Sequence, residues 1–304
     1  VPLDVGYGMA NHTILRRASE ELRREFLPGI IRGEIEFCLG YTEPEAGSDL
    51  ASMQMRAVED GDYFIINGQK TFNTECHYAN YHWLAARTDP DATPKYRGIS
   101  LFIVDLNSPG ITIRPMVVMS GEITNEVFYD NVRVPKARMI GEKNKGFYYM
   151  MEALDTERNM VIVPQRLYFL LDELVQYCKE TRRGGKTLAE DPVIRGKLAQ
   201  IAIDLDVAKV LTEHSQWMEH VGRPMTYEPN VVKVMTSEAE HFLVTCGMEI
   251  LGLYSQLEED SKWVPLRGRM EWYYLHDPIS RIGGGTNEIE RNVIAQRGLG
   301  LPRG

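Results

Sequence analysis

The pattern of apolar residues changes character twice along the chain, and this order constrains the fold more than any other feature. Residues 1 to about 35 place apolar side chains at helical spacing, with Pro28 and Gly29 as a break. From Ile35 onward, short runs rich in β-branched and aromatic residues are separated by turn signals such as Asp60-Gly61-Asp62. Because no helical segment is interleaved with these runs, they predict an antiparallel sheet and not βαβ units.

From about Glu142 the chain is predicted to be helical to its end. Helix–helix packing is the natural way to bury the apolar stripes of these segments. The long helical segments span 145–182, 190–222, 229–253 and 286–298. The sequence therefore predicts an α+β protein in three parts: an N-terminal helical part at 1–35, a central antiparallel β domain at 36–141 and a C-terminal helical bundle at 142–304.

The composition narrows the classes of function. The 304 residues are 43% hydrophobic and 25% charged, as expected of a soluble globular protein, and the formal net charge is −9. Lysines and arginines do not cluster with aromatic residues, which argues against a nucleic-acid partner. No apolar run is long enough to span a bilayer, so no membrane span is expected.

The cysteines and histidines give no local signal of a metal site. The four cysteines are far apart and form no C-x-x-C pair, and the seven histidines show no H-E-x-x-H spacing. We therefore expect no metal, and free buried thiols in a reducing compartment, either the cytoplasm or the mitochondrial matrix of a eukaryote. The cysteines are Cys38, Cys76, Cys178 and Cys246.

The stretch "YTEPEAGSDL" (residues 41–50) is predicted to be a strand that ends in a polar turn. Thr42 and Ser48 offer hydroxyls, and Gly47 lets a ligand approach the backbone closely. Such a turn can bind an anion, and a plain β-turn explains the same residues.

A second stretch, "INGQKTFNTECHYANY" (residues 66–81), carries Phe72 two residues before Thr74. In a strand, these two side chains point to the same face. A flat ring beside a hydroxyl suits a planar heteroaromatic ligand. Ordinary sheet packing is the alternative.

A third stretch contains Glu157 within a helical pattern. Its neighbours three and four positions away are Ala153, Leu154, Met160 and Val161, whereas Asp155 and Arg158 lie off this apolar stripe. Desolvation raises the pKa of a carboxylate on an apolar stripe, which suits a general base. A carboxylate that reaches an ion pair at the edge of the bundle is the alternative.

Together these stretches resemble one family, the flavin-dependent acyl-CoA dehydrogenases. The resemblance runs in the family's order over essentially the whole chain, through "YTEPEAGSDL", "INGQKTFNT", "RGISLFIVD", "NEVFYDNVRVP", "IGEKNKGF", "LDTER" and "IGGGTNEIERNVIAQR". It implies an N-terminal helical domain, a central β domain and a C-terminal four-helix bundle. It also implies that much of the N-terminal helical domain precedes Val1. The implied cofactor is FAD, the substrate an acyl-CoA, the electron acceptor an electron-transferring flavoprotein and the assembly a homo- or heterotetramer.

The resemblance also assigns roles to residues. Many relatives have their catalytic glutamate in the C-terminal loop, where this chain has Gly284. In a branch similar to the isovaleryl-CoA and long-chain dehydrogenases, the base lies on a bundle helix directly before an arginine, which is Glu157 here. Asn287 and Glu290 are expected to begin the last helix as a capping box. The cofactor-binding positions are Leu39, Tyr41, Thr42, Gly47, Ser48, Phe72, Thr74, Thr286 and Glu288. The substrate-binding positions are Asp155, Arg158, Arg223 and Gly284.

Two segments depart from the family pattern. "ETRRGGK" (residues 180–186) replaces a run of the form E-R-x-x-F-G, and "EILGL" (residues 249–253) replaces Q-x-x-G-G, so that Glu249 brings a carboxylate to a surface used for FAD in relatives. These departures leave two alternatives open. The chain can be a weakly catalytic or structural subunit of a hetero-oligomer, or an oxygen-using oxidase or monooxygenase on the same fold.

Overall fold

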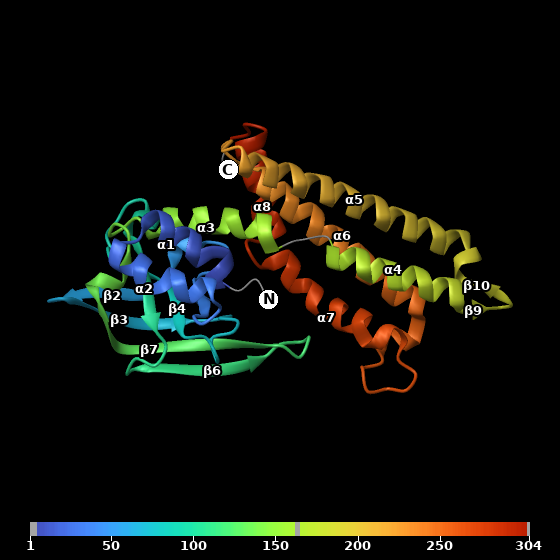
Figure 1. Ribbon diagram of the computed structural model, residues 1–304, viewed down its shortest axis with the longest axis horizontal. Coiled ribbons are helices and arrows are strands. Elements are labelled where there is room, and N and C mark those ends of the chain that lie inside the picture. The colour runs from blue at the N-terminus through green and yellow to red at the C-terminus, as the bar shows by residue number, and fades with distance from the viewer. Residues whose placement is uncertain (1–4, 162–164, 303–304) are drawn as a thin grey trace. The chain divides into compact units, whose positions relative to one another are not determined.

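The structure is a computed structural model, which describes the backbone of residues 5–161 and 165–302 and their side chains except those of 6, 7 and 156–161. The chain divides into two compact units, Val1–Glu157 and Arg158–Gly304 (Figure 1). Each unit is described by itself. The predicted domain limits at 35/36 and 141/142 stay a prediction.

The first unit contains two short helices, eight strands and a longer helix. Strands form where the sequence alternates and where turn residues bound the runs. The elements are α1 (Asn11–Arg17), α2 (Glu20–Ile31), β1 (Phe37–Gly40), β2 (Arg56–Asp60), β3 (Tyr63–Lys70), β4 (Tyr81–Arg87), β5 (Ile99–Asp105), β6 (Ile111–Val117), β7 (Ile123–Pro135), β8 (Met139–Ile140) and α3 (Gly146–Val161).

Helix α2 continues past the expected break. Ser19 caps it by accepting a hydrogen bond from the Leu22 amide, and Pro28 lies inside the last part of the helix. Proline removes one donor, and so close to the end of a helix this leaves the remaining turns intact. The helix ends at Ile31 and a turn follows at Gly33, whose φ of +69° favours glycine.

The strands form one sheet in the order β6-β7-β3-β2-β4-β5-β8, with β1 paired to β4. Most neighbours are antiparallel, as expected, but β1 and β2 both run parallel to β4. The sheet is therefore mixed. The parallel pairing of β1 with β4 arises because the β2–β3 hairpin lies between them in sequence and carries the chain back.

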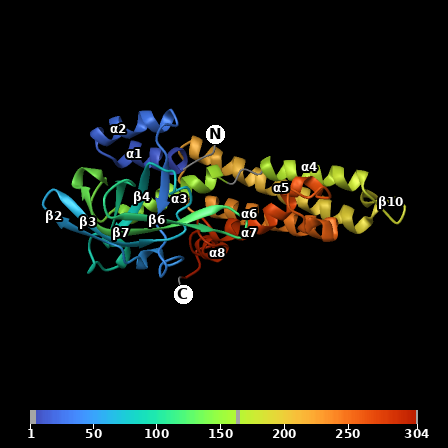
Figure 2. The same ribbon diagram turned by 90° about the horizontal axis from the view of Figure 1, so that it is seen from below.

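Two apolar clusters cover the two faces of β4 and β5. On one face, helices α1, α2 and α3 pack against Trp83 and Leu101, and the helices lie together on that side of the strands (Figures 1 and 2). On the other face, Leu84 and Phe102 pack against residues of β2, β3 and β7. The sheet thus bends so that two of its parts face each other across a second core.

The second unit is a bundle of helices. Its elements are α4 (Gln165–Glu180), β9 (Arg182–Arg183), β10 (Lys186–Thr187), α5 (Pro192–His220), α6 (Glu228–Leu251), α7 (Arg269–Ile282) and α8 (Asn287–Val293). Its core is formed mainly by α4, α5 and α6 (Figure 2). Helix α7 was not among the expected long segments, because Pro278 lies inside it and proline usually marks a helix break. The expected segment 145–182 comprises α3 and α4. No helix in the described part of the chain is long and apolar enough to cross a bilayer.

Candidate active site

A buried ion pair holds the polar turn 41–50 against the end of β3. Lys70 is fully buried, and its Nζ donates hydrogen bonds to the Tyr41 carbonyl at 2.9 Å and to Glu43 Oε1 at 2.8 Å. The Glu43 carboxylate also accepts from the amides of Gln54 at 2.5 Å and Met55 at 3.0 Å. Burial lowers the pKa of Lys70 to about 8. The turn is therefore fixed from its interior side.

Sequence reasoning missed both members of this pair, although each lies inside a stretch that was singled out. Glu43 belongs to "YTEPEAGSDL" and Lys70 to "INGQKTFNT". The sequence signal that could have found them is a pair of opposite charges at strand ends: Glu43 follows β1 and Lys70 ends β3. Lys and Glu are usually exposed, so sequence alone does not identify them as buried partners.

The residues at the end of β1 are held by hydrogen bonds to neighbouring segments. Tyr41 is buried, and its hydroxyl accepts a hydrogen bond from Trp83 Nε1 at 3.1 Å. The Leu39 carbonyl accepts from Asn73 Nδ2 at 2.7 Å, and the Thr42 carbonyl accepts from the Thr71 amide at 3.0 Å. These bonds join the end of β1 to the segment that follows β3.

Phe72 and Thr74 are not in a strand, so the shared-face argument for them was wrong. Strand β3 ends at Lys70, and Phe72 has a left-handed φ of +56° in a tight turn where the Thr74 amide donates to the Phe72 carbonyl at 3.1 Å. Both side chains are nevertheless exposed. Thr71, which precedes Phe72, and Asn73, which lies between the two, are buried. The turn, and not a pleat, presents the ring and the hydroxyl to solvent.

The open side of the turn 41–50 carries unpaired hydroxyls. Backbone hydrogen bonds between Glu43 and Ala46, both of 3.1 Å, close the turn. Ser48 and Gly47 are exposed and Thr42 is half-buried. Within the described residues, the hydroxyls of Thr42 and Ser48 make no hydrogen bond, and the space beside Gly47 is open. The surface so formed has donors and acceptors available for a polar ligand.

Helix α3 carries Glu157, Asp155 and Arg158. Ala153 and Leu154, two of the four apolar neighbours expected for Glu157, are buried in the first core. The side chains of Glu157, Arg158 and the other two neighbours lie outside the described residues. Asp155 is half-buried. The structure therefore supports the N-terminal half of the predicted apolar stripe.

In the second unit, the glycine loop precedes α8. Gly284 and Gly285 have φ values of +67° and +101°, which side chains rarely tolerate. Thr286 caps α8 by accepting from the Ile289 amide at 3.2 Å, and Glu288 is exposed on the first turn. The loop thus presents backbone and leads directly into a capped helix.

The expected capping box at Asn287 was wrong by one residue. The helix is capped by Thr286, and Asn287 is buried within it, where it accepts from Lys233 Nζ at 2.7 Å. Glu290 is also buried and accepts from the Asn230 side chain. Polar residues that look like caps in sequence here fix α8 against α6.

The remaining predicted positions of the second unit lie on its surface. Arg223 follows α5, is exposed, and places its guanidinium 5.1 Å from the centre of the Trp217 ring. Glu249 pairs with Lys197, and Leu253 is 84% exposed. Glu249 lines a cavity of about 500 Å³ with Gly252 and others. The carboxylate of the altered "EILGL" segment is therefore paired and not left unbalanced.

Comparison with known proteins matches most of the chain. The family described as "Acyl-CoA dehydrogenase, middle domain" matches residues 38–132, and "Acyl-CoA dehydrogenase, C-terminal domain" matches 144–299. Acyl-CoA dehydrogenase FadE26 of Mycobacterium tuberculosis is 35% identical over 297 residues, which cover 96% of this chain and 74% of FadE26.

Two solved structures are similar over nearly all of the chain. The ChsE4-ChsE5 complex from Mycobacterium tuberculosis has a TM-score of 0.92 at 34% identity and covers 100% of this chain and 78% of that chain. The Tcur3481-Tcur3483 steroid ACAD has a TM-score of 0.93 at 32% identity and covers 99% of this chain and 77% of that one.

Proposed function

The chain belongs to the acyl-CoA dehydrogenase family, and we propose that it oxidises an acyl-CoA thioester to the trans-2-enoyl-CoA, with Glu157 as the base that removes the α-proton. Members of the family are FAD-dependent flavoproteins, so the chain is an oxidoreductase that acts on an acyl-CoA and uses FAD. The reaction removes a proton from the α-carbon and a hydride from the β-carbon. The family alone does not identify the base, so the residues of this chain must support it.

The observation that carries the proposal is the packing of α3. Ala153 and Leu154 are buried in the same cluster as Tyr41, and Leu39 packs against that cluster. Glu157 follows these two residues by one helical turn, so its backbone position lies on the side of α3 that faces this core. The helix proposed to hold the base is thus fixed to the strand end proposed to face the flavin.

The residues of the first unit fit FAD. The exposed Phe72 ring is held by a turn whose neighbouring residues are buried and hydrogen-bonded, so it offers a fixed flat surface. Exposed hydroxyls of Ser48 and Thr74 have no partner in the described residues. We assign them to the polar edge of the isoalloxazine and to the phosphates. Gly47 leaves the space that such a ligand needs.

Bound FAD supplies the acceptor for the β-hydride. The chain's own part is to hold the thioester in position, to exclude water and to remove the α-proton at a carboxylate of Glu157. A base is effective when its pKa lies near the working pH. An apolar helix face raises the pKa of a carboxylate toward that pH. A buried core that fixes α3 also fixes the position of the base.

We assign the CoA moiety to Asp155, Arg158 and Arg223, and the acyl end near Gly284, as the family resemblance implies. Arg223 supports this assignment because its exposed guanidinium is oriented by Trp217 and can bind a phosphate in a bidentate manner. We assign Thr286 and Glu288 to contacts with FAD from the start of α8. We also propose electron-transferring flavoprotein as the electron acceptor.

The test is the flavin spectrum of the purified protein before and after addition of a panel of acyl-CoAs under anaerobic conditions. A thioester that is a substrate should bleach the oxidised flavin band. We expect Glu157→Gln to keep its flavin and to bleach about 10²–10⁴-fold more slowly. Glu152→Gln is the matched control, because Glu152 lies on the same helix and forms ion pairs with Arg16 and Arg17.

Equal bleaching by Glu157→Gln and Glu152→Gln would assign the base to another residue. Oxygen consumption without an added electron acceptor would favour the oxidase alternative. The same samples therefore separate the reaction class from the identity of the base.

A second candidate function is that of a subunit in a hetero-oligomer. The altered segments at residues 180–186 and 249–253 favour it, and one similar solved structure is a complex of two different proteins, ChsE4 and ChsE5. In one of these segments, Glu249 forms an ion pair with Lys197. Such a subunit, purified alone, should be colourless, and it should become yellow with FAD only when its partner is added.

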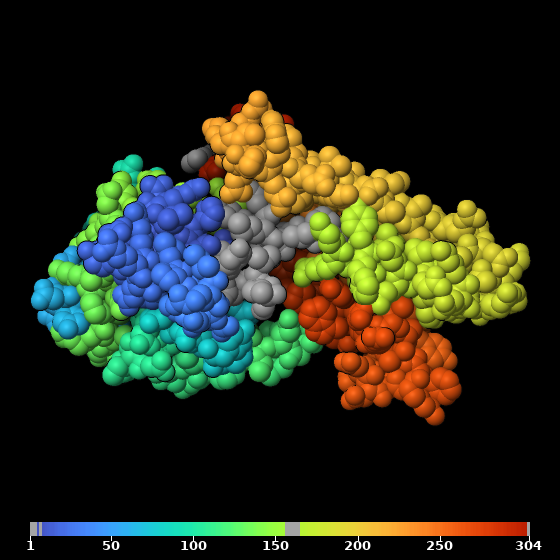
Figure 3. Space-filling view, viewed as in Figure 1, coloured from blue at the N-terminus to red at the C-terminus, as the bar shows by residue number. Residues whose placement is uncertain are grey.

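The assembly of either form is proposed to involve α5. Its buried face points into the bundle, and its opposite face exposes apolar side chains at spacings of four, three and seven residues, which suits packing against another helix. Figure 3 shows residues of α5 at the surface of the molecule. These exposed side chains are Ile203, Val207, Val210 and Trp217. We propose that this stripe contacts another subunit of a tetramer.

A further inference from the structure

Three metal-ligating side chains meet in the second core of the first unit. The Sγ atoms of Cys38 and Cys76 and a ring nitrogen of His82 all lie within 4.8 Å of one another, and all three residues are buried. No other such group of three or more was found among the described residues. The cluster lies apart from the exposed surface assigned to FAD.

Strand register assembles this cluster. Cys38 on β1 is the direct partner of His82 on the parallel strand β4. Cys76 comes from the turn after β3, where its amide donates to the Asn73 carbonyl. Gly40 makes room for the imidazole, because a Cβ at that position would lie 2.2 Å from His82 Nε2. The fold therefore reserves space for a ring that points between the strands.

The hydrogen bonding of His82 leaves one nitrogen without a partner. Nδ1 lies 2.7 Å from the Tyr129 hydroxyl, whereas Nε2 is buried and has no hydrogen-bond partner. A buried polar atom without a partner costs about 1–3 kcal/mol, so it calls for an explanation. A lone pair on a neutral imidazole is what a metal ion requires.

All four cysteines are buried among apolar residues, but among the described residues only Cys38 and Cys76 adjoin other metal-ligating side chains. Cys178 and Cys246 are buried in the second unit among aliphatic residues, as small apolar side chains often are. Cys38 and Cys76 instead adjoin each other and a histidine with an unused nitrogen. Two thiols and an imidazole favour thiophilic ions over Mg²⁺ or Ca²⁺, which prefer oxygen ligands.

We propose that Cys38, Cys76 and His82 bind one thiophilic metal ion, Zn²⁺ or Cu⁺. Zn²⁺ takes four ligands and would need water or another donor beside these three side chains, whereas Cu⁺ is satisfied by three. Each cysteine binds as a thiolate, so binding releases its proton to water. The ion would tie β1 and β4 to the turn that presents Phe72 and Thr74.

The test uses the full chain, unfolded under reducing conditions and refolded anaerobically with Zn²⁺, with Cu⁺ or with neither, because the ligands are buried. Metal is then counted by elemental analysis after gel filtration. We expect about one ion per chain in the wild type with one of the two metals. Refolding with Co²⁺ should add a thiolate charge-transfer band.

Cys76→Ala should lower metal retention about tenfold or more, whereas Cys178→Ala, the matched buried thiol of the second unit, should leave it unchanged. His82→Asn provides a second variant for the case in which Cys76→Ala does not fold. Wild type that refolds and retains neither ion overturns the proposal. So does Cys76→Ala or His82→Asn that retains as much metal as the wild type.

Discussion

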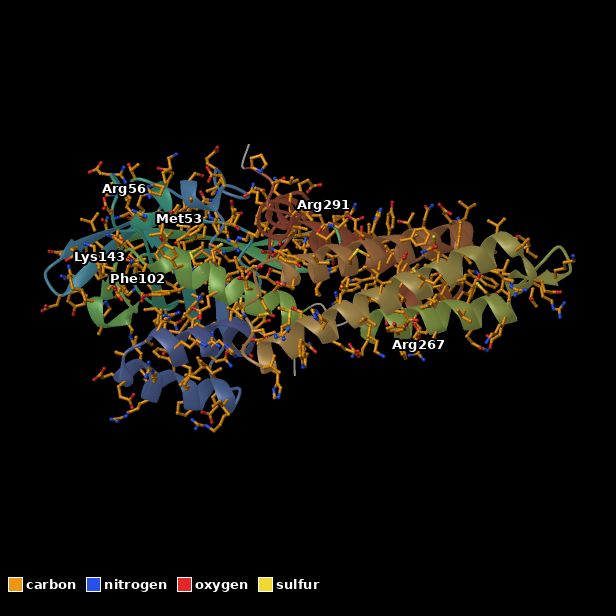
Figure 4. The ribbon with its side chains drawn as sticks, turned by 90° about the horizontal axis from the view of Figure 1, so that it is seen from above. Met53, Arg56, Phe102, Lys143, Arg267 and Arg291 are labelled. Carbon is orange, nitrogen blue, oxygen red and sulfur yellow. The ribbon has the colours of Figure 1, made fainter. Side chains whose placement is uncertain are left out.

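Replacing Lys70 by Met should destabilise the first unit and release the turn that faces the proposed flavin site. Lys70 is fully buried, and its ammonium group is the only side-chain cation bonded to Glu43 among the described residues. Methionine fills a similar volume but donates no hydrogen bond. The Tyr41 carbonyl and the Glu43 carboxylate would both lose a donor, and a negative charge would remain in the core beside Met53 (labelled in Figure 4).

The size of the effect follows from what remains around Glu43. Removing one partner of a buried ion pair costs about 3–5 kcal/mol, because the other charge is left uncompensated. The amides of Gln54 and Met55 still donate to the carboxylate, and the charge of Arg87 lies nearby. These contacts place the expected loss of unfolding free energy near the lower end, at about 3 kcal/mol.

Glu43→Gln should cost less than Lys70→Met. The pKa of Lys70 is already lowered to about 8 by burial, so the amine can release its proton once the carboxylate is gone. The double variant should be more stable than Lys70→Met alone, because it leaves no buried charge. A double-mutant cycle thus measures the pair and separates it from the loss of packing.

The assay is urea unfolding at pH 7, where Lys70 is protonated, followed by far-UV circular dichroism, with FAD content measured on the same preparations. We expect Lys70→Met to lose both stability and flavin. The reasoning is refuted if Lys70→Met loses less than about 1 kcal/mol, the range of an exposed pair. It is also refuted if the double variant is less stable than both single variants.

Four further outcomes are expected. Phe72→Ala should lower FAD affinity with little change in unfolding free energy, because the ring is exposed; isothermal titration with FAD and urea unfolding measure the two. Burial raises the pKa of Glu240, so in the native protein this carboxyl stays protonated above the ordinary carboxyl pKa. The free energy of unfolding therefore falls as pH rises from the ordinary carboxyl pKa to the raised one. In unfolding curves, Glu240→Gln should reduce this slope by up to about 1.4 kcal/mol per pH unit. Burial acts to raise the pKa of Glu238, but its hydrogen bonds outweigh burial and lower this pKa. Glu238→Gln should therefore change the pH dependence of the unfolding free energy in the opposite direction to Glu240→Gln. Val207→Glu combined with Val210→Glu should reduce the oligomer mass in light scattering, and an unchanged mass would exclude the α5 stripe as a contact between subunits.

Local pattern predicted the strands of the first unit well, because alternation and turn residues are short-range signals. Each strand from β1 to β7 overlaps a run rich in β-branched and aromatic residues, although β3 and β7 extend beyond theirs, and the turn Asp60-Gly61-Asp62 does separate β2 from β3. The parallel pairing of β1 with β4 was missed, because it joins segments separated by a hairpin and has no local signature. Helix α7 was missed although its sequence is amphipathic, because Pro278 lies inside it and proline usually marks a helix break.

The exposed part of the candidate site was predicted better than its support. Phe72 and Thr74 are both exposed, but on a turn with a left-handed residue and not on the expected strand. Lys70 and Glu43, which hold that region in place, were not predicted. Charged residues are assigned to solvent by default, and only the three-dimensional structure shows that two of them share a buried space.

The same limit applies to spacing rules for metal ligands. Those rules detect ligands that one hairpin or one helix brings together, such as C-x-x-C or H-E-x-x-H. Cys38 and His82 are neighbours only because β1 pairs with β4, and Cys76 joins them only because the turn after β3 folds back over β1. A cluster assembled by strand register leaves no periodic trace in the sequence. The non-local pairing that made the sheet mixed is therefore also what creates the proposed metal site, and a variant that disrupts the β1–β4 pairing should affect both.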